Sequence, residues 1–370
     1  MKKFLKTTGI VILILVLAIV LAALAAVLVF VVGNNNNTST GLATIQNSEI
    51  DYNTEINGAI YIPADDYNAW QLWENYDTAI IDRDMGYAES AGLNAIRVFT
   101  SYEYWREDPE GLIEKFENLI ETAGEHGIRV MPVLFEDCGV DNTKENREAA
   151  DDATGFCVCS PERAVQQNKS RYHEVDDYVD AFMEKYGSDD RLLAIEIMNE
   201  PHLLSRNVGF SKYVLKKARS YQGTVPLTMG QLTIFHNLLY PGELDIYQYH
   251  DNYPNSTNRL VAEMKIGNYF QEKTGRPFWL TEWQRGRTAG GGWGDADIPE
   301  SDKTPDLKSL AGVIEDNQVC SFFWSLMVKQ AYLPPQRLNG TFNGLFYADG
   351  TVYSEEDLAA IQSLSGLNGE

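Results

Sequence analysis

Short apolar runs alternate with stretches of helical periodicity along most of this chain. Eight of the runs have the length and the β-branched or aromatic content of buried strands. They are GAIYI (58–62), NAIRVF (94–99), IRVMPVLF (128–135), LLAIEIMN (192–199), VPLTM (225–229), LDIYQYH (244–250), PFWLTE (277–282) and CSFFWSLM (320–327). Amphipathic helical patterns fit between them, for example over 109–126, 172–186, 258–274 and 304–316. This alternation is typical of a parallel sheet with helical crossovers.

Eight such units predict an α/β fold of the (β/α)8 barrel type. We expect one domain over residues 51–370, because no interior stretch has the composition of a linker. A doubly wound sheet is not indicated, since no Gly-x-Gly-x-x-Gly follows an early strand. In a barrel of this kind the chemistry lies at the carboxyl ends of the strands. Two long insertions, 138–171 after the third strand and 284–303 after the seventh, would overhang that face.

The amino-terminal segment, residues 1–33, has a different pattern. Lys2, Lys3 and Lys6 precede an uninterrupted apolar run from residue 10 to residue 32, which is long enough to span a bilayer. The run exceeds the apolar core of a cleaved signal peptide, so a signal anchor is favoured over a cleaved signal sequence. The lysines would stay cytoplasmic and the rest of the chain would lie outside, or be secreted if the segment is cleaved. Residues 34–50 are predicted to be a polar tether.

The composition is acidic and narrows the range of partners. Asp and Glu number 53 and Lys and Arg number 30, which gives a net charge of -23 and, without the three leading lysines, of -26. Such a surface repels nucleic acid, anionic lipid and acidic polysaccharides, and so fits a neutral substrate. Adaptation to salt, or simply a well-solvated surface, would explain the same composition.

Two of the apolar runs lead to a glutamate. LLAIEIMN continues into Asn199-Glu200-Pro201, and PFWLTE ends at Glu282. Cleavage of a glycosidic bond needs two carboxyl groups, one as acid and one as base or nucleophile. At the ends of the fourth and seventh strands of a barrel, Glu200 and Glu282 would lie on the same face. The pair predicts a glycosidase active site; the alternative is that both carboxylates are structural.

On these residues the chain resembles glycoside hydrolase family 5, the cellulase and mannanase family of retaining barrel glycosidases, over roughly residues 56–364. The resemblance implies that Glu200 is the acid/base and Glu282 the nucleophile of a double displacement. It also implies endo action on a β-1,4-linked polysaccharide such as mannan or a glucan. Two alternatives remain: an exo-acting β-mannosidase or related β-glycosidase, with the 138–171 insertion closing one end of the cleft, and a non-catalytic carbohydrate-binding barrel.

Several neighbours of this pair are expected to assist it. Arg97 alternates onto the inner face of the second strand, where it would face Glu282 or pair with Glu196 as a structural ion pair. Asn199 is the expected donor to the sugar 2-hydroxyl, because that bond strengthens in the transition state. His250 and one tyrosine are also expected to assist.

The family places His-x-Tyr after the sixth strand. Here the sequence is His250-Asp-Asn-Tyr253, one residue longer, which leaves open whether Tyr253 or Tyr249 supports the nucleophile. The third strand also departs from the family, ending in Glu136-Asp137 where many members have a histidine.

Aromatic residues complete the predicted substrate site. Trp324 lies in the eighth strand, where the family uses a tryptophan as the floor under the sugar, and an indole face binds the C–H groups of a pyranose by apolar contact. Trp283 follows Glu282 directly and is expected to line a subsite.

No cofactor and no metal are expected. The sequence Cys157-Val-Cys159 matches no standard zinc spacing. In an external domain Cys138 is instead predicted to form a disulfide with Cys157 or Cys159, and Cys320 to be a buried thiol.

Overall fold

The computed structural model describes residues 18, 21–35, 39–288, 295 and 297–365. Its centre is a parallel sheet with the strand order β5-β4-β3-β2-β1-β8-β7-β6. The strands are β1 (Asn57–Tyr61), β2 (Ala95–Phe99), β3 (Arg129–Val133), β4 (Ile195–Asn199), β5 (Leu227–Gly230), β6 (Tyr247–His250), β7 (Phe278–Trp283) and β8 (Ser321–Phe323). All eight predicted strands are therefore confirmed, in the order of a (β/α)8 barrel.

The barrel is nearly closed. β5 and β6, the two ends of the strand order, are not paired in a regular ladder. Instead the backbone N–H of Asp245 donates to the carbonyl of Leu227 and that of His250 to the carbonyl of Gln231, each at 2.9 Å. Most strand residues are buried on both faces, as expected for a parallel sheet covered by helices, which explains why the strands read as continuous apolar runs.

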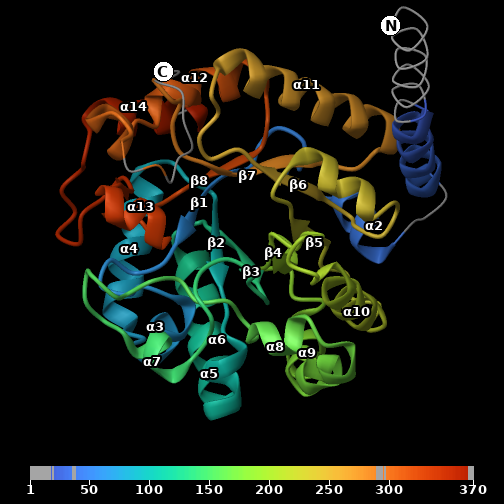
Figure 1. Cartoon of the computed structure of the whole chain (residues 1–370), viewed down its shortest axis with the longest axis horizontal. Helices are drawn as coiled ribbons and strands as arrows, with labels where there is room; N and C mark the ends of the chain where they lie inside the picture. The colour runs from blue at the N-terminus through green and yellow to red at the C-terminus, as the bar shows by residue number, and fades with distance from the viewer. Residues whose placement is uncertain (1–17, 19–20, 36–38, 289–294, 296, 366–370) are drawn as a thin grey trace, which may run out of the picture.

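Helices surround the barrel (Figure 1). They are α3 (Ala69–Glu74), α4 (Thr78–Ser90), α5 (Tyr102–Glu107), α6 (Pro109–Glu125), α9 (Asp176–Tyr186), α10 (Val208–Arg219), α11 (Thr257–Thr274), α12 (Lys308–Asp316) and α14 (Glu355–Leu364). The side chain of Asp108 caps α6, whose first residue is a proline, and Gly275 ends α11 with φ of +66°. The predicted helices differ from the observed ones mainly at their first residues. In the helix predicted over 172–186, for example, residues 172–175 belong to the 3-10 helix η1 (Lys169–Val175).

Long segments extend the active face beyond the strands. The insertion after β3 contains α7 (Lys144–Glu148), α8 (Arg163–Gln166) and η1. The segment after β5 contains η2 (Ile234–Leu239), and the one after β7 contains η3 (Glu300–Lys303), with residues 289–294 and 296 outside the described part. A further insertion after β8, which the sequence did not indicate, consists of β9 (Lys329–Gln330), α13 (Pro334–Asn339) and β10 (Phe342–Asn343).

The amino-terminal segment is described only from residue 18 onward, so much of the predicted span 10–32 lies outside the described residues. Within the described part no single helix is long and apolar enough to cross a membrane. The helix Leu21–Asn35 and α2 (Thr40–Gln46) meet that test only as a pair, bent by 79°. Phe30 of the first helix packs against Tyr247 and Phe270, with ring centroids 4.9 and 5.2 Å apart.

Residues 34–50, predicted to be a polar tether, include the helix α2. The Thr40 hydroxyl of this helix donates to the carbonyl of Gly223. Leu42 and Ile45 are buried. Two apolar side chains on one face of a short helix are enough to hold it against the barrel.

Candidate active site

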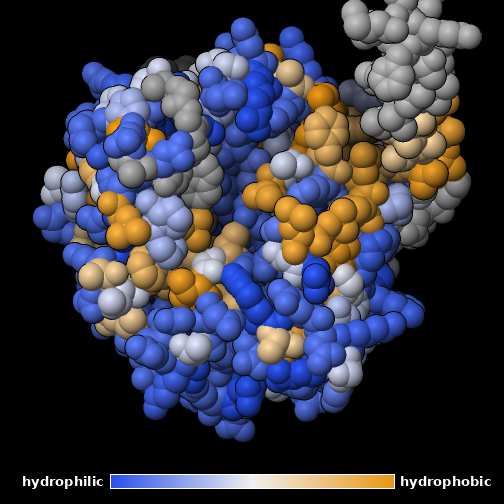
Figure 2. Space-filling view, in the orientation of Figure 1, coloured by the Kyte–Doolittle hydropathy of each residue, from blue (hydrophilic) through white to orange (hydrophobic). Residues whose placement is uncertain are grey.

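A pocket opens at the carboxyl ends of the strands, where Figure 2 shows a central hollow lined with polar residues. Its cavity volume is about 250 Å³, and both Glu200 and Glu282 line it. Sites for drug-sized ligands are usually about 300–1,000 Å³. The cavity is therefore small for a ligand site.

Glu200 reaches the pocket because the backbone turns sharply after β4. Its φ is +50°, in the left-handed region that non-glycine residues rarely adopt, and its N–H donates to the carbonyl of Gly230 at 2.9 Å. The pairing of β4 with β5 shifts register between Glu196 and Asn199. This irregularity explains why Asn199, three residues after Glu196, shares its inward direction instead of alternating away from it. Strained backbone of this kind is frequent at functional sites.

Arg97 joins the two strands that carry the acidic groups. Its Nε and Nη2 donate to the two carboxylate oxygens of Glu196 at 2.7 and 2.6 Å, and its Nη1 donates to Glu282 Oε1 at 2.7 Å. Nη2 also donates to Asn199 Oδ1 at 2.7 Å. Arg97 is fully buried, and so it holds Glu282 from below rather than lining the pocket. The two contacts that the sequence suggested as alternatives for Arg97, with Glu282 and with Glu196, are therefore both present.

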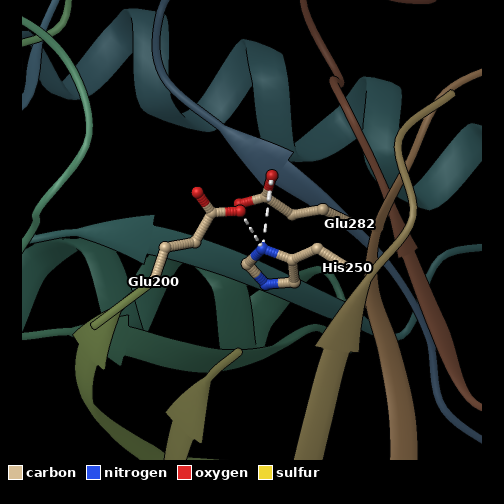
Figure 3. A group of neighbouring side chains, drawn as sticks. All are labelled: Glu200, His250 and Glu282. Atoms are coloured by element: carbon tan, nitrogen blue, oxygen red, sulfur yellow. Dashed lines mark hydrogen bonds and ion pairs between the residues drawn. The ribbon is translucent and has the colours of Figure 1, made fainter. Parts of the chain in front are cut away.

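His250 lies between the two glutamates (Figure 3). Its Nδ1 is 2.6 Å from Glu200 Oε1 and 3.7 Å from Glu282 Oε2. Burial acts to lower the pKa of His250, but the negative charges of Glu282 and Glu200 outweigh it and the net direction is upward. For Glu200, burial acts to raise the pKa and the hydrogen bond from His250 outweighs it, so the net direction is downward. The two opposite shifts favour a proton on the imidazole of His250 over a proton on the carboxyl group of Glu200.

The same three residues have the composition of a metal site. One ligand atom each from Glu200, His250 and Glu282 lies within 4.8 Å of the others. The 2.6 Å separation of His250 Nδ1 and Glu200 Oε1 is that of a short hydrogen bond. Two ligands of one zinc ion, each about 2.0–2.2 Å from it, would be farther apart. The geometry therefore fits a shared proton better than a metal ion.

Glu136, at the end of the third strand run, is a third carboxyl group in the pocket. It accepts from Asn199 Nδ2 at 2.9 Å and from the backbone N–H of Cys138 at 2.6 Å, and among the described residues no ion pair to it is present. Burial raises its pKa to about 8 in spite of these hydrogen bonds, and the charges of Glu200 and Glu282 act in the same direction. Glu136 is therefore protonated at neutral pH.

The nucleophile candidate has a partner that the sequence interpretation missed. Asn252 Nδ2 donates to Glu282 Oε2 at 2.9 Å, whereas the Tyr253 hydroxyl donates to Gln284 Oε1 and Asn343 Oδ1. Tyr253 lines the pocket without contacting Glu282, and Tyr249 is buried. Counted from His250, residue 252 is the position where the family has its tyrosine. The spacing along the sequence from His250, and not the nearest tyrosine, therefore identifies the residue that contacts Glu282.

The two predicted tryptophans differ in position. Trp324 is half-buried, follows β8 directly and lines the pocket, with Tyr332 edge-on to it at 5.2 Å between ring centroids. Trp283 is fully buried, packs against Phe323 and does not line the pocket, because the side chain that follows Glu282 along the strand points to the other face.

The predicted disulfide is wrong, since all four cysteines are free. The thiol of Cys138 contacts Glu200, with Sγ 2.8 Å from Oε2. Cys159 Sγ is instead 3.7 Å from Asp141 Oδ1. Cys320 is buried, as expected.

A parallel barrel with two close carboxyl groups at the ends of its fourth and seventh strands defines a class of barrel enzymes that act on glycosidic bonds. The sequence profile of the family Cellulase (glycosyl hydrolase family 5) matches residues 64–330, which is more than half of the chain. The chain belongs to this family of O-glycosyl hydrolases. No sequence among the curated proteins matches it.

Similar solved structures share the barrel at low sequence identity. An exo-β-1,4-mannosidase from Opitutaceae bacterium strain TAV5 has a TM-score of 0.60 at 14% identity, over 86% of this chain and 62% of that one. The endo-1,4-β-D-mannanase from Thermotoga petrophila RKU-1 has a TM-score of 0.56 at 13% identity, over 85% and 99%. A family 5 enzyme from Bifidobacterium longum, in complex with Manβ1-4GlcNAc, has 0.59 at 11%, over 85% and 79%. At such identities the likeness shows the fold.

Proposed function

We propose that this protein is a retaining β-glycosidase in which Glu200 is the acid/base and Glu282 the nucleophile. The observation that carries the proposal is the separation of the two groups, with one oxygen of each within 4.8 Å. Retaining glycosidases have carboxyl groups about 5–5.5 Å apart, whereas inverting ones need about 6.5–9.5 Å to admit a water molecule. The short separation supports a double displacement.

In the first step Glu282 attacks the anomeric carbon while the leaving oxygen takes a proton from Glu200, and a glycosyl ester forms on Glu282. In the second step Glu200 takes a proton from water, whose oxygen attacks the anomeric carbon and releases Glu282. The proton for the first step comes from the Glu200–His250 pair through Nδ1 and Oε1, which are 2.6 Å apart. Arg97 and Asn252 hold Glu282 in the orientation for attack through hydrogen bonds to its two oxygens.

The positions of the groups give the direction of the substrate. Glu200 must lie beside the departing oxygen, so the leaving group extends over the ends of β4 and β5. The sugar under attack then lies on the other side of Glu282, over Trp324. The segments after β4 and β5 carry the exposed apolar side chains of Leu203, Leu204 and Phe235. Figure 2 shows an apolar surface beside the hollow.

The opposite side is closed by three segments bonded to one another. Asn68, after β1, donates to the carbonyls of Arg147 and Phe156 in the insertion after β3, at 3.2 and 3.4 Å. The backbone N–H of residue 157 donates to the carbonyl of Tyr332 in the insertion after β8, at 3.3 Å. Arg337 Nη1 from that insertion donates to the carbonyl of Asp152 at 2.7 Å. These bonds join the loops into a wall beyond Trp324.

A wall at this end leaves room for one sugar and blocks a chain that continues past it. We therefore propose exo action, with release of one sugar at a time from the non-reducing end, in preference to the endo action that family resemblance implies. A β-mannoside is the first substrate to test, because two of the similar structures are an exo-mannosidase and a complex with Manβ1-4GlcNAc.

The mechanism is tested with Glu282→Ala and Glu200→Ala, and Glu125→Ala on the exposed surface of α6 serves as the control. Glu282→Ala should lose turnover on every substrate. Glu200→Ala should keep activity on dinitrophenyl glycosides, which need no protonation, and added azide should give a β-glycosyl azide. A 2-deoxy-2-fluoro glycoside should label Glu282. An inverted first product, or a label elsewhere, would refute double displacement. Binding without turnover on any glycoside would favour the non-catalytic barrel.

Exo action is tested on mannohexaose labelled at its reducing end, with cello-oligosaccharides, mannan and xylan in parallel. Exo action predicts free mannose and labelled products that shorten by one sugar at a time. Labelled trimers or tetramers as first products would show endo action and contradict the wall. Preference for glucosides with the same ladder would change the sugar and leave the mode of action in place.

We also propose that residues 10–32 anchor the chain in a membrane with the barrel outside. The uninterrupted apolar run with lysines only on its amino side supports this. In membrane fractions of expressing cells the full chain should resist extraction by carbonate, and protease added outside should digest the barrel. A native amino terminus within the run, on protein found in the medium, would contradict the anchor.

A further inference from the structure

Cys138 contacts the acid/base carboxyl directly. Its Sγ lies 2.8 Å from Glu200 Oε2, and the thiol lines the pocket. The backbone N–H of the same residue donates to Glu136 Oε1 at 2.6 Å, which fixes the loop that carries the thiol. Asn199 Nδ2 approaches the sulfur at 3.8 Å. The thiol therefore has a defined position between two polar groups of the pocket.

The thiol acts as a hydrogen-bond donor. Burial raises the pKa of Cys138 well above its ordinary value, and the negative charge of Glu200 acts in the same direction. A neutral S–H can donate, and the ionised carboxylate of Glu200 can only accept. With His250 Nδ1 at Oε1 and Cys138 at Oε2, each oxygen of Glu200 has one donor.

The two donors differ in strength. The imidazolium of His250 is a charged donor that also carries the transferable proton, whereas a thiol is a weak donor. A weak donor at Oε2 holds the carboxylate in one orientation without strongly opposing the protonation of Glu200. A stronger donor at the same place would favour the ionised form of Glu200 and oppose its protonation.

We propose that Cys138 is a positioning residue whose bond to Oε2 fixes the Glu200 carboxyl group so that Oε1, which receives the proton from His250, faces the leaving oxygen, and which sets the proton affinity of the Glu200–His250 pair. This proposal rests on the proposed function of Glu200 as the acid/base. Cys138 forms no bond to the substrate and takes no part in redox chemistry; its contribution is a hydrogen bond whose strength is tuned to the acid/base cycle.

The test measures proton affinity separately from turnover. His250 is one of five histidines, so selective labelling allows its imidazole to be titrated by NMR in the full chain in detergent. Cys138→Ala removes a donor to the ionised carboxylate and should raise the titration midpoint of the pair by roughly half to one pH unit. Cys138→Ser supplies a stronger donor and should lower it. Cys159→Ala, in the same insertion but outside the pocket, is the control and should leave it unchanged.

Kinetics give the second measurement. The alkaline limb of kcat/KM should move in the same direction as the midpoint in each variant, and kcat on dinitrophenyl glycosides should change less than kcat on mannobiose. If Cys138→Ala does not fold, the proposal is tested by Cys138→Ser alone, in which the titration midpoint and the alkaline limb should both move to lower pH. A midpoint and a limb that are unchanged in the folded variants would overturn the proposal. If the wild-type protein has no glycosidase activity, the proposed function is refuted instead. The NMR titration does not depend on turnover, so the failure of the proposed function and the failure of the proposal on Cys138 can be distinguished.

Discussion

Replacing Glu136 by glutamine should make the barrel more stable, by an amount that increases with pH. Glu136 is buried, accepts hydrogen bonds from Asn199 and Cys138, and has a pKa raised to about 8. Glutamine keeps an acceptor oxygen for both donors and has no proton to lose. The substitution thus removes an ionisation and preserves the shape of the site.

The magnitude follows from linkage. A carboxyl group with a pKa near 4.5 in the unfolded chain and about 8 in the fold binds its proton more tightly when folded. Its contribution to stability is therefore complete below about pH 4.5 and is lost as pH rises toward 8. One pH unit corresponds to about 1.4 kcal/mol, so roughly 3 to 4 kcal/mol is lost between about pH 5 and pH 8. Glu136→Gln should not show this loss.

The assay is urea unfolding of the full chain in detergent at about pH 5 and about pH 8, followed by tryptophan fluorescence. The free energy of unfolding of Glu136→Gln, relative to wild type, should increase between the two pH values by roughly the 3 to 4 kcal/mol worked out above. Glu125→Gln, on the exposed surface of α6, is the control and should change equally little at both. An equal difference at the two pH values would refute the reasoning, because it would mean that Glu136 is ionised throughout.

Three further outcomes are expected from the contacts of the site. Asn252→Ala removes a hydrogen bond to Glu282, so kcat/KM should fall roughly 10- to 100-fold while the free energy of unfolding changes little. Trp324→Ala removes the indole that lines the pocket as the proposed floor under the sugar, and it should raise KM more than it lowers kcat in steady-state assays. Arg97→Met leaves the buried Glu196 unpaired and should destabilise the fold by about 3–5 kcal/mol in urea unfolding, so that little folded protein is recovered; a stable Arg97→Met protein would contradict this.

The strands and their order were predictable because each is a short apolar run. A parallel strand covered on both faces has no polar side, so its sequence is nearly continuous in apolar residues. Glu200 and Glu282 were predictable for a related reason, since each stands where such a run ends. The insertion after β8 gave no comparable signal, because β9 and β10 are two residues each. The wall that the insertion helps to form depends on contacts with residues 63–66 and 152–157, far away in sequence.

The errors have identifiable physical causes. The disulfide was inferred from three cysteines near one loop, but bridging depends on distance and direction in space, and here Cys138 faces Glu200. Trp283 was expected in the pocket because it follows Glu282, whereas successive side chains of a strand point to opposite faces. Asn252 was not predicted because the family has a tyrosine at this position. The position is defined by its spacing along the sequence from His250.

The charges of the site lead to one more prediction. Two cationic groups meet the pocket carboxylates: Arg97 holds Glu282, and His250 holds Glu200. Glu136 has no such partner among the described residues and keeps its proton, with a pKa of about 8. As pH rises, activity should therefore be lost through two ionisations. Deprotonation of the Glu200–His250 pair removes the proton that the proposed mechanism transfers. Ionisation of Glu136 adds a negative charge near the proposed nucleophile, Glu282, and raises the proton affinity of the pair. Plotted as log kcat/KM against pH, the alkaline limb of the wild-type protein should steepen toward a slope of about -2, whereas in Glu136→Gln only the pair ionises and the slope should stay near -1. The two slopes are compared on a substrate that needs acid assistance, at pH values where the wild-type protein and Glu136→Gln both remain folded. Identical slopes would mean that Glu136 does not ionise in the active pH range.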